Sequence, residues 1–158
     1  ILRDDYDNWD VPTLQEEYNA YKQDNPLPYK ELIFPDVLKV LNEVKSRGLK
    51  IGLASSSVKA DILRALKENH LDGFFDVVLS GEEFKESKPN PEIYLTALNQ
   101  LGVKPNQALI IEDSEKGIAA GVAAGVGVWA IKDNRFGMNQ GAAKGLLDNL
   151  IDVLDLLE

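Results

Sequence analysis

From Phe34 onward, short apolar runs alternate with stretches of helical periodicity, and this alternation restricts the possible folds more than any other feature of the chain. Apolar runs that alternate with helices are typical of a parallel sheet with helices packed on it. Each run is apolar enough to be covered on both faces, as buried parallel strands are. The runs cover residues 49–54, 75–79, 108–111 and 126–131. The sequence therefore predicts an α/β fold in which a doubly wound, Rossmann-like parallel sheet is flanked by helices.

The predicted helices between these runs have recognisable ends. Pro35 suits the first position of a helix, and Gly48 suits the left-handed position that ends it. Pro91 and Gly102 bound a second helix in the same way. Further helices are predicted after Ser57, over residues 114–124 and over residues 146–157.

Residues 1–33 differ from the rest of the chain. They are rich in acidic and aromatic residues, contain no strand-like run and end near Pro26 and Pro28. We expect a small helical element there, joined to an α/β body that covers residues 34–158.

Composition excludes several classes of partner and site. The chain has 158 residues, enough for one globular domain, and 17 Lys and Arg against 26 Asp and Glu give a formal charge of -9. This charge repels phosphate backbones and anionic lipid, so we expect neither nucleic acid nor a membrane as a partner. The absence of cysteine excludes thiolate zinc sites and thiol nucleophiles. No signal sequence opens the chain and no apolar run reaches the roughly 20 residues of a membrane span, so we expect a cytoplasmic location.

Polar residues follow the predicted strands at the points where ligands bind in such folds. Ser55 and Ser56 follow the first run, Lys88 lies between the second run and the next helix, and Glu112 and Asp113 follow the third run. Loops and helix N-termini converge beyond the carboxyl ends of parallel strands. We therefore expect a hydroxyl group, an ammonium group and a pair of carboxylates at one edge of the sheet.

Each of these groups has a purely structural explanation when it is taken alone. Serines cap helices, acidic residues are favoured at helix N-termini, and most lysines are exposed. Together they match the requirements of phosphoryl transfer, in which donors and cations meet the phosphoryl oxygens while carboxylates hold Mg²⁺. The combination predicts a magnesium-dependent phosphoryl-transfer site, but it lacks a nucleophile.

Three segments resemble, in order, the second, third and fourth motifs of the haloacid dehalogenase-like superfamily, in its β-phosphoglucomutase-like and phosphatase branch. They are IGLASSS at residues 51–57, SKPNPEIY at residues 87–94 and LIIEDSEKGI at residues 109–118. The resemblance covers most of residues 12–158. It implies a phosphatase or phosphomutase that acts on a small phosphorylated metabolite with Mg²⁺ as cofactor.

The resemblance also implies a role for each matching residue. Ser55 would hydrogen-bond to the transferred phosphoryl group, with further contacts from Ser56. Lys88 would bridge that group and the nucleophilic carboxylate. Asp113 would ligate Mg²⁺, and Glu112 would do so directly or through water.

The chain departs from the family pattern at the first motif, which supplies the nucleophile as an Asp-x-Asp sequence after an apolar strand. Asp5-Tyr6-Asp7 has no such strand before it. We therefore expect the nucleophile upstream of Ile1, residues 1–33 as the C-terminal part of a helical cap, and residues 34–158 as a core that lacks the first-motif strand. That strand would come from another segment or from a neighbouring chain, and this chain alone would be inactive.

Two other functions compete with this interpretation. A catalytically inactive binding fragment would keep the fold and the acidic pair. A phosphoacceptor signalling domain uses the same residue types, but its acidic pair comes early and its lysine last, whereas here the order is Ser55, Lys88, Glu112. The sequence leaves the choice between phosphatase and phosphomutase open.

Overall fold

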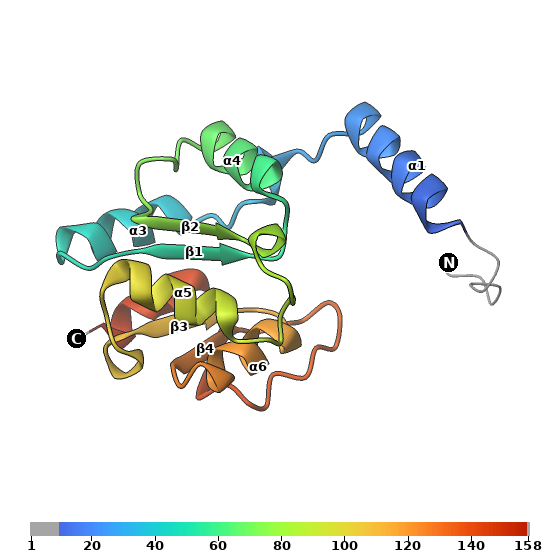
Figure 1. Cartoon of the computed structure of the whole chain (residues 1–158). Helices are drawn as coiled ribbons and strands as arrows, with labels where there is room; N and C mark the ends of the chain where they lie inside the picture. Colours follow the sequence, from blue (N-terminus) through green and yellow to red (C-terminus); the bar gives the residue numbers. More distant parts are fainter. Residues whose placement is uncertain (1–9, 158) are drawn as a thin grey trace. The chain divides into compact units, whose positions relative to one another are not determined.

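The structure is a computed structural model that describes residues 10–157 (Figure 1). The chain divides into two compact units, Ile1–Leu32 and Ile33–Glu158. The described part of the first unit contains helices α1 (Val11–Asp24) and α2 (Tyr29–Leu32). Asp10 precedes α1, and its carboxylate accepts a hydrogen bond from the Thr13 hydroxyl. The helical character predicted for this segment is confirmed.

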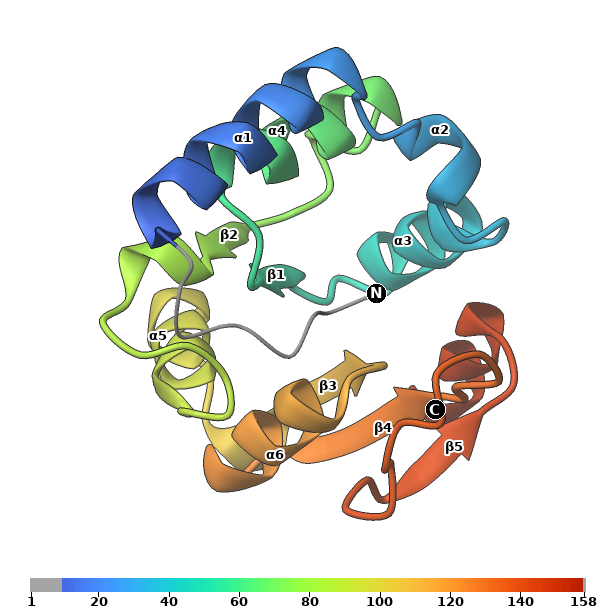
Figure 2. The ribbon, with the colours of Figure 1, turned by 90° about the vertical axis from the view of Figure 1, so that its right-hand side faces the viewer.

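The second unit contains parallel strands in two groups. Strand β1 (Gly52–Ser55) pairs with β2 (Val77–Ser80), and β4 (Gly127–Ile131) lies between β3 (Leu109–Glu112) and β5 (Gly145–Leu147). Both views show β1 and β2 apart from the other three strands (Figures 1 and 2). Within residues 10–157, no backbone pairing joins the two groups. The predicted α/β fold with parallel strands is confirmed.

Helices follow the strands as the sequence pattern predicts. They are α3 (Val37–Ser46), α4 (Lys59–Glu68), α5 (Glu92–Leu101) and α6 (Glu115–Ala123), with short 3₁₀ turns at Gly81–Glu83 and Pro105–Gln107. Gly48 and Gly102 have φ values of 73° and 69°, the left-handed conformation expected where α3 and α5 end. The Ser114 side chain caps α6 by accepting a hydrogen bond from the Gly117 N–H.

Helix α5 links the two groups of strands through the main hydrophobic core. It packs on β1 and β2 and also contacts α6. Helix α6 lies close to β4, because a Cβ atom at Gly121 would lie 2.6 Å from Val128 Cγ2. The buried residues of this core are Val77, Leu79, Ile93, Tyr94, Ala97, Leu98, Ala120, Ala124 and Val126. The packing of α5 and α6 fixes the strand ends that carry the predicted site.

The predicted helix over residues 146–157 is wrong. Its first part is β5, in which Leu147 is buried and lies opposite Ile131 of β4, and its remainder is the 3₁₀ helix η4 (Leu150–Leu156). The Asn149 N–H donates to the Asp152 carboxylate at 2.8 Å and so begins a turn between them. Leucines at this spacing fit a strand followed by a turn as well as a helix, and pairing with β4 decides between the two.

The expectation that every strand is covered on both faces is also wrong for two of them. In β1, Gly52 is exposed and the other residues are half-buried, and all of β3 is half-buried. Most of β2 and several residues of β4 are buried. One-sided pairing alone is not the reason, because β2 also has a single neighbouring strand within the described residues and is mostly buried. What β1 and β3 share is that they are the edge strands that face one another between the two groups (Figure 2).

None of the helices in residues 10–157 combines the length and the apolar character that a transmembrane helix needs.

We expect Ile118→Ala to lower the free energy of unfolding by roughly 2–5 kcal/mol, because it opens a cavity at a side chain that is 1% exposed on α6. Val122→Ala on the same helix is the matched control, since Val122 is 47% exposed, and it should change stability by less than about 0.5 kcal/mol. Urea denaturation measures both values. Equal losses would contradict the assignment of Ile118 to the core.

Candidate active site

The loop that follows β1 carries the predicted serines. Ser55 is the last residue of β1, and its hydroxyl accepts a hydrogen bond from the Ser57 N–H at 3.1 Å. The Ser57 carbonyl accepts a hydrogen bond from Ser80, a fully buried residue at the end of β2, at 2.7 Å. Ser56 is exposed at the tip. The neighbouring strand therefore fixes the path of the serine loop.

Lys88 connects the ends of β1 and β3. Its ammonium group lies 3.1 Å from the Ala54 carbonyl, the residue before Ser55, and 2.6 Å from Glu112 Oε1 at the end of β3. The Lys88 and Glu112 side chains are 8% and 9% exposed, so this is a buried ion pair. The pair spans two strands that share no backbone hydrogen bond.

Tyr94 completes this arrangement from α5, and sequence reasoning treated it only as part of a motif. Its hydroxyl donates to Glu112 Oε1 at 2.6 Å and accepts from Lys88 Nζ at 3.0 Å, while the ammonium lies 4.8 Å from the ring centroid. Burial raises the pKa of the Tyr94 hydroxyl, and the charge of Glu112 raises it further. A buried tyrosine hydroxyl needs a hydrogen-bond partner. This requirement is the one feature of the sequence that could have indicated a contact between Tyr94 and the polar residues at the strand ends.

The Glu112 carboxylate is held on both of its oxygens. Oε2 accepts hydrogen bonds from the N–H groups of Asp113 and Ser114 and from the Ser114 hydroxyl, at 3.1, 3.3 and 3.0 Å. Burial favours the neutral acid, but the hydrogen bonds from Lys88 and Tyr94 and the lysine charge hold the Glu112 pKa below its ordinary value. A Cβ atom at Gly117 would lie 2.0 Å from this carboxylate, so the position requires glycine.

Asp113 differs from its neighbour. It is exposed, and among the described residues its carboxylate has no hydrogen bond or ion pair. Its carbonyl accepts a hydrogen bond from the Gln140 amide at 2.8 Å, and Gln140 also bonds to the backbone of Ile131 and Asp133 at 2.8 and 3.0 Å. Gln140 therefore ties the loop after β4 to the acidic loop, a role that the sequence does not indicate.

The carboxylate oxygens at this edge of the sheet can be compared with the ligands that Mg²⁺ requires. No group of three or more His, Cys, Asp and Glu side chains within the described part of the chain could hold a metal ion. Mg²⁺ needs only one or two carboxylates when water and phosphate fill the other positions. The free carboxylate of Asp113 suits a direct ligand, whereas Glu112 already bonds with both oxygens. The residues fit Mg²⁺ through Asp113, with Glu112 acting through water.

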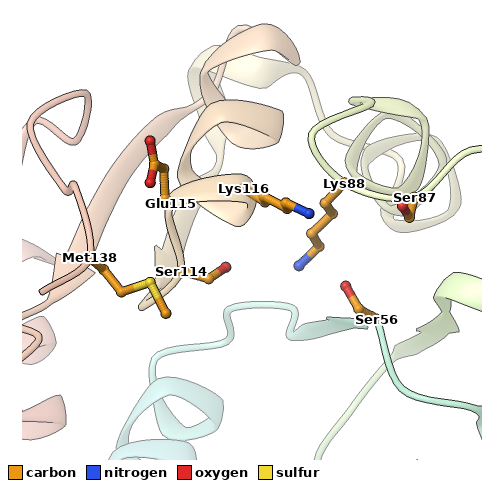
Figure 3. A pocket seen from close by; sticks show the side chains of 7 residues that line it. All are labelled: Ser56, Ser87, Lys88, Ser114, Glu115, Lys116 and Met138. Carbon is orange, nitrogen blue, oxygen red and sulfur yellow. The ribbon is translucent and has the colours of Figure 1, made fainter. Parts of the chain in front are cut away.

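A cavity of about 420 Å³ opens beside these groups (Figure 3). Ser56 and Lys88 line it, Ser55 and Asp113 are chain neighbours of lining residues, and Glu112 accepts hydrogen bonds from the lining residues Lys88 and Ser114. Its lining residues are Ser56, Ser87, Lys88, Ser114, Glu115, Lys116 and Met138. The structure thus brings Lys88 and Glu112 into direct contact and places Lys88 against Ala54, the residue before Ser55, while Ser56 lines the cavity and Asp113 follows Glu112. Asp5 and Asp7 lie outside the described residues.

Comparison with known proteins decides the family. The family model described as haloacid dehalogenase-like hydrolase matches residues 2–131. The chain belongs to this hydrolase family. The predicted resemblance is therefore confirmed.

Proteins similar to this chain include phosphatases and a phosphomutase. The chain is 30% identical to the pyrophosphatase PpaX of Bacillus cereus (strain AH820) over 162 residues, which cover 99% of this chain and 74% of that protein. It is 39% identical to a phosphorylated carbohydrates phosphatase of Thermotoga maritima over 92 residues, 58% of this chain and 43% of that protein. The crystal structure of a beta-phosphoglucomutase from Clostridium difficile is similar with a TM-score of 0.75 at 26% identity, covering 92% of this chain and 65% of that one.

We expect Lys88→Met to lower the free energy of unfolding by roughly 3–5 kcal/mol, because it leaves the buried Glu112 carboxylate without its cation. The double variant Lys88→Met/Glu112→Gln should lose less than the single variant, because no buried charge then remains. Denaturant unfolding of both variants measures the difference.

Lys132→Met is the control for this pair. It removes the partner of Asp148 in an exposed ion pair of 3.4 Å, with side chains 48% and 78% exposed, and should cost at most about 1 kcal/mol. If Lys88→Met also lowers the free energy of unfolding by no more than about 1 kcal/mol, the buried pair does not hold the two strand ends together.

Proposed function

We propose that this chain binds the phosphoryl group of a small phosphorylated metabolite in a magnesium-dependent phosphatase or phosphomutase. The observation that carries the proposal is the Lys88 ammonium, which bonds at once to the end of β1 next to Ser55 and to Glu112 at the end of β3. Relatives named as phosphatases and as a phosphomutase support the reaction class.

The serine loop and Lys88 would bind the phosphoryl oxygens. Hydroxyl and backbone N–H groups of Ser55 and Ser56 donate hydrogen bonds, and Lys88 neutralises negative charge. Tyr94 and Glu112 hold the ammonium at this position, so that it needs little rearrangement when the anion arrives.

Asp113 would hold Mg²⁺, with Glu112 bonded to a water of the ion. When bound, Mg²⁺ neutralises charge that develops on the phosphoryl oxygens. Gln140 and the Glu112 carboxylate fix the backbone around Asp113, so its side chain projects from a rigid loop.

The nucleophilic aspartate and one further strand belong to this proposal as well. A strand between β1 and β3 would pair with both and would cover the half-exposed residues of each. An aspartate at its carboxyl end would then stand next to Lys88. The strand would come from a segment upstream of Ile1 or from a neighbouring chain, and the 158-residue chain alone would be inactive.

Titration with inorganic phosphate and Mg²⁺, followed by NMR of the 158-residue chain, tests the function. We expect shifts at the amides of Ser55 to Ser57, Lys88 and Asp113 to Ser114. Asp113→Asn changes an exposed side chain and should leave stability within about 0.5 kcal/mol of the parent, but it should remove the effect of Mg²⁺ on phosphate affinity. Lys67→Met, in the last turn of α4, is the control for a change of charge.

Two results would overturn the proposal. One is phosphate binding with shifts that spare the serine loop and Lys88. The other is hydrolysis of an aryl phosphate by the 158-residue chain that Asp5→Asn abolishes, since the nucleophile would then lie within this chain.

A further inference from the structure

Lys116 is a second cation at the cavity and has no part in the roles described so far. It lies in the first turn of α6 and lines the cavity together with Lys88. Figure 3 shows the two lysine side chains extending toward one another, while Glu115 on the same helix points away from both. Lys116 is exposed, and within the described residues it forms no ion pair.

The position of Lys116 is unfavourable for a lysine on electrostatic grounds. The N-terminus of a helix carries partial positive charge, so a cation in the first turn destabilises the helix. The residues three and four positions later are Ala119 and Ala120, so α6 offers no carboxylate partner there. The acidic residues three and four positions earlier are Asp113 and Glu112, and among the described residues neither forms an ion pair with Lys116. The side chain also extends toward Lys88, another ammonium group, and away from Glu115. An anion between the two lysines would remove both penalties.

The two lysines differ in how much charge they offer a ligand. Lys88 already bonds to Glu112 at 2.6 Å, so much of its charge is compensated inside the protein. Lys116 forms no ion pair within the described residues, and the exposed residues Ser56 and Ser87 line the same cavity, whereas the Ser114 hydroxyl is bonded to Glu112. A ligand with two neighbouring anionic groups fits this arrangement better than one with a single group.

We propose that Lys116 is a specificity-determining residue that binds a second anionic group of the substrate, next to the phosphoryl group held at Lys88. The substrate class is a phosphorylated compound with a second phosphoryl or carboxylate group close to the first. This inference rests on the proposed function, because it places the transferred phosphoryl group at Lys88.

Binding of four small anions to the 158-residue chain tests the inference, without divalent cations so that chelation does not enter the comparison. Pyrophosphate carries a second phosphoryl group, phosphoglycolate carries a carboxylate, and phenyl phosphate and inorganic phosphate carry neither. We expect Lys116→Met to weaken pyrophosphate or phosphoglycolate binding about three- to tenfold, and phenyl phosphate and phosphate binding less than about twofold. If the affinity for pyrophosphate falls more, the second group is a phosphoryl group; if the affinity for phosphoglycolate falls more, it is a carboxylate.

Lys116→Arg keeps the positive charge and should retain the preference for the doubly anionic ligands. Lys67→Met is the control and should leave all affinities unchanged, because it removes a charge in the last turn of α4. If Lys116→Met weakens the binding of all four anions equally, or weakens none, the role of Lys116 is overturned. Phosphate binding by the parent chain would still support the proposed function in that case. Failure of the parent chain to bind phosphate would instead overturn the proposed function.

Discussion

The ammonium group of Lys88 holds together the ends of two strands that share no backbone hydrogen bonds. It bonds to the Ala54 carbonyl at the end of β1 and to Glu112 at the end of β3. A buried ion pair is stable only when its remaining donors and acceptors are satisfied. Tyr94 and Ser114 supply those partners here, and Gly117 leaves room for the carboxylate. The cavity and the loops around it depend on this arrangement.

Local signals in the sequence were sufficient to predict most of the fold. The apolar runs predicted β1 to β4 within a few residues, and proline and glycine predicted the ends of α3 and α5. The approach of Lys88 to Glu112 and to the end of β1 could be predicted because Ser55 and Glu112 end parallel strands, Lys88 lies in the loop after β2, and parallel strands direct their carboxyl ends to the same edge.

The remaining features depend on contacts between distant parts of the chain. The leucines of residues 146–157 fit a helix until Leu147 pairs with Ile131. The half-exposure of β1 and β3, the edge strands of the two groups that face one another, depends on which strands pair, and apolar runs do not encode this. The bonds from Gln140 to the acidic loop span 27 positions, and nothing in the residue type indicates them. The family resemblance implied Asp113 as a Mg²⁺ ligand and Glu112 as a direct or water-mediated one. It did not indicate that Glu112 pairs with Lys88 while the Asp113 carboxylate has no partner among the described residues.

A crystal structure of the 158-residue chain soaked with tungstate, a heavy analogue of phosphate, tests most directly whether these groups surround one anion. The expected result is a single tungstate within hydrogen-bond distance of Lys88 Nζ and of the Ser55 or Ser56 hydroxyl, next to the Asp113 loop. Tungstate bound elsewhere, or Ser55, Lys88 and Asp113 too far apart to touch one anion, would contradict it.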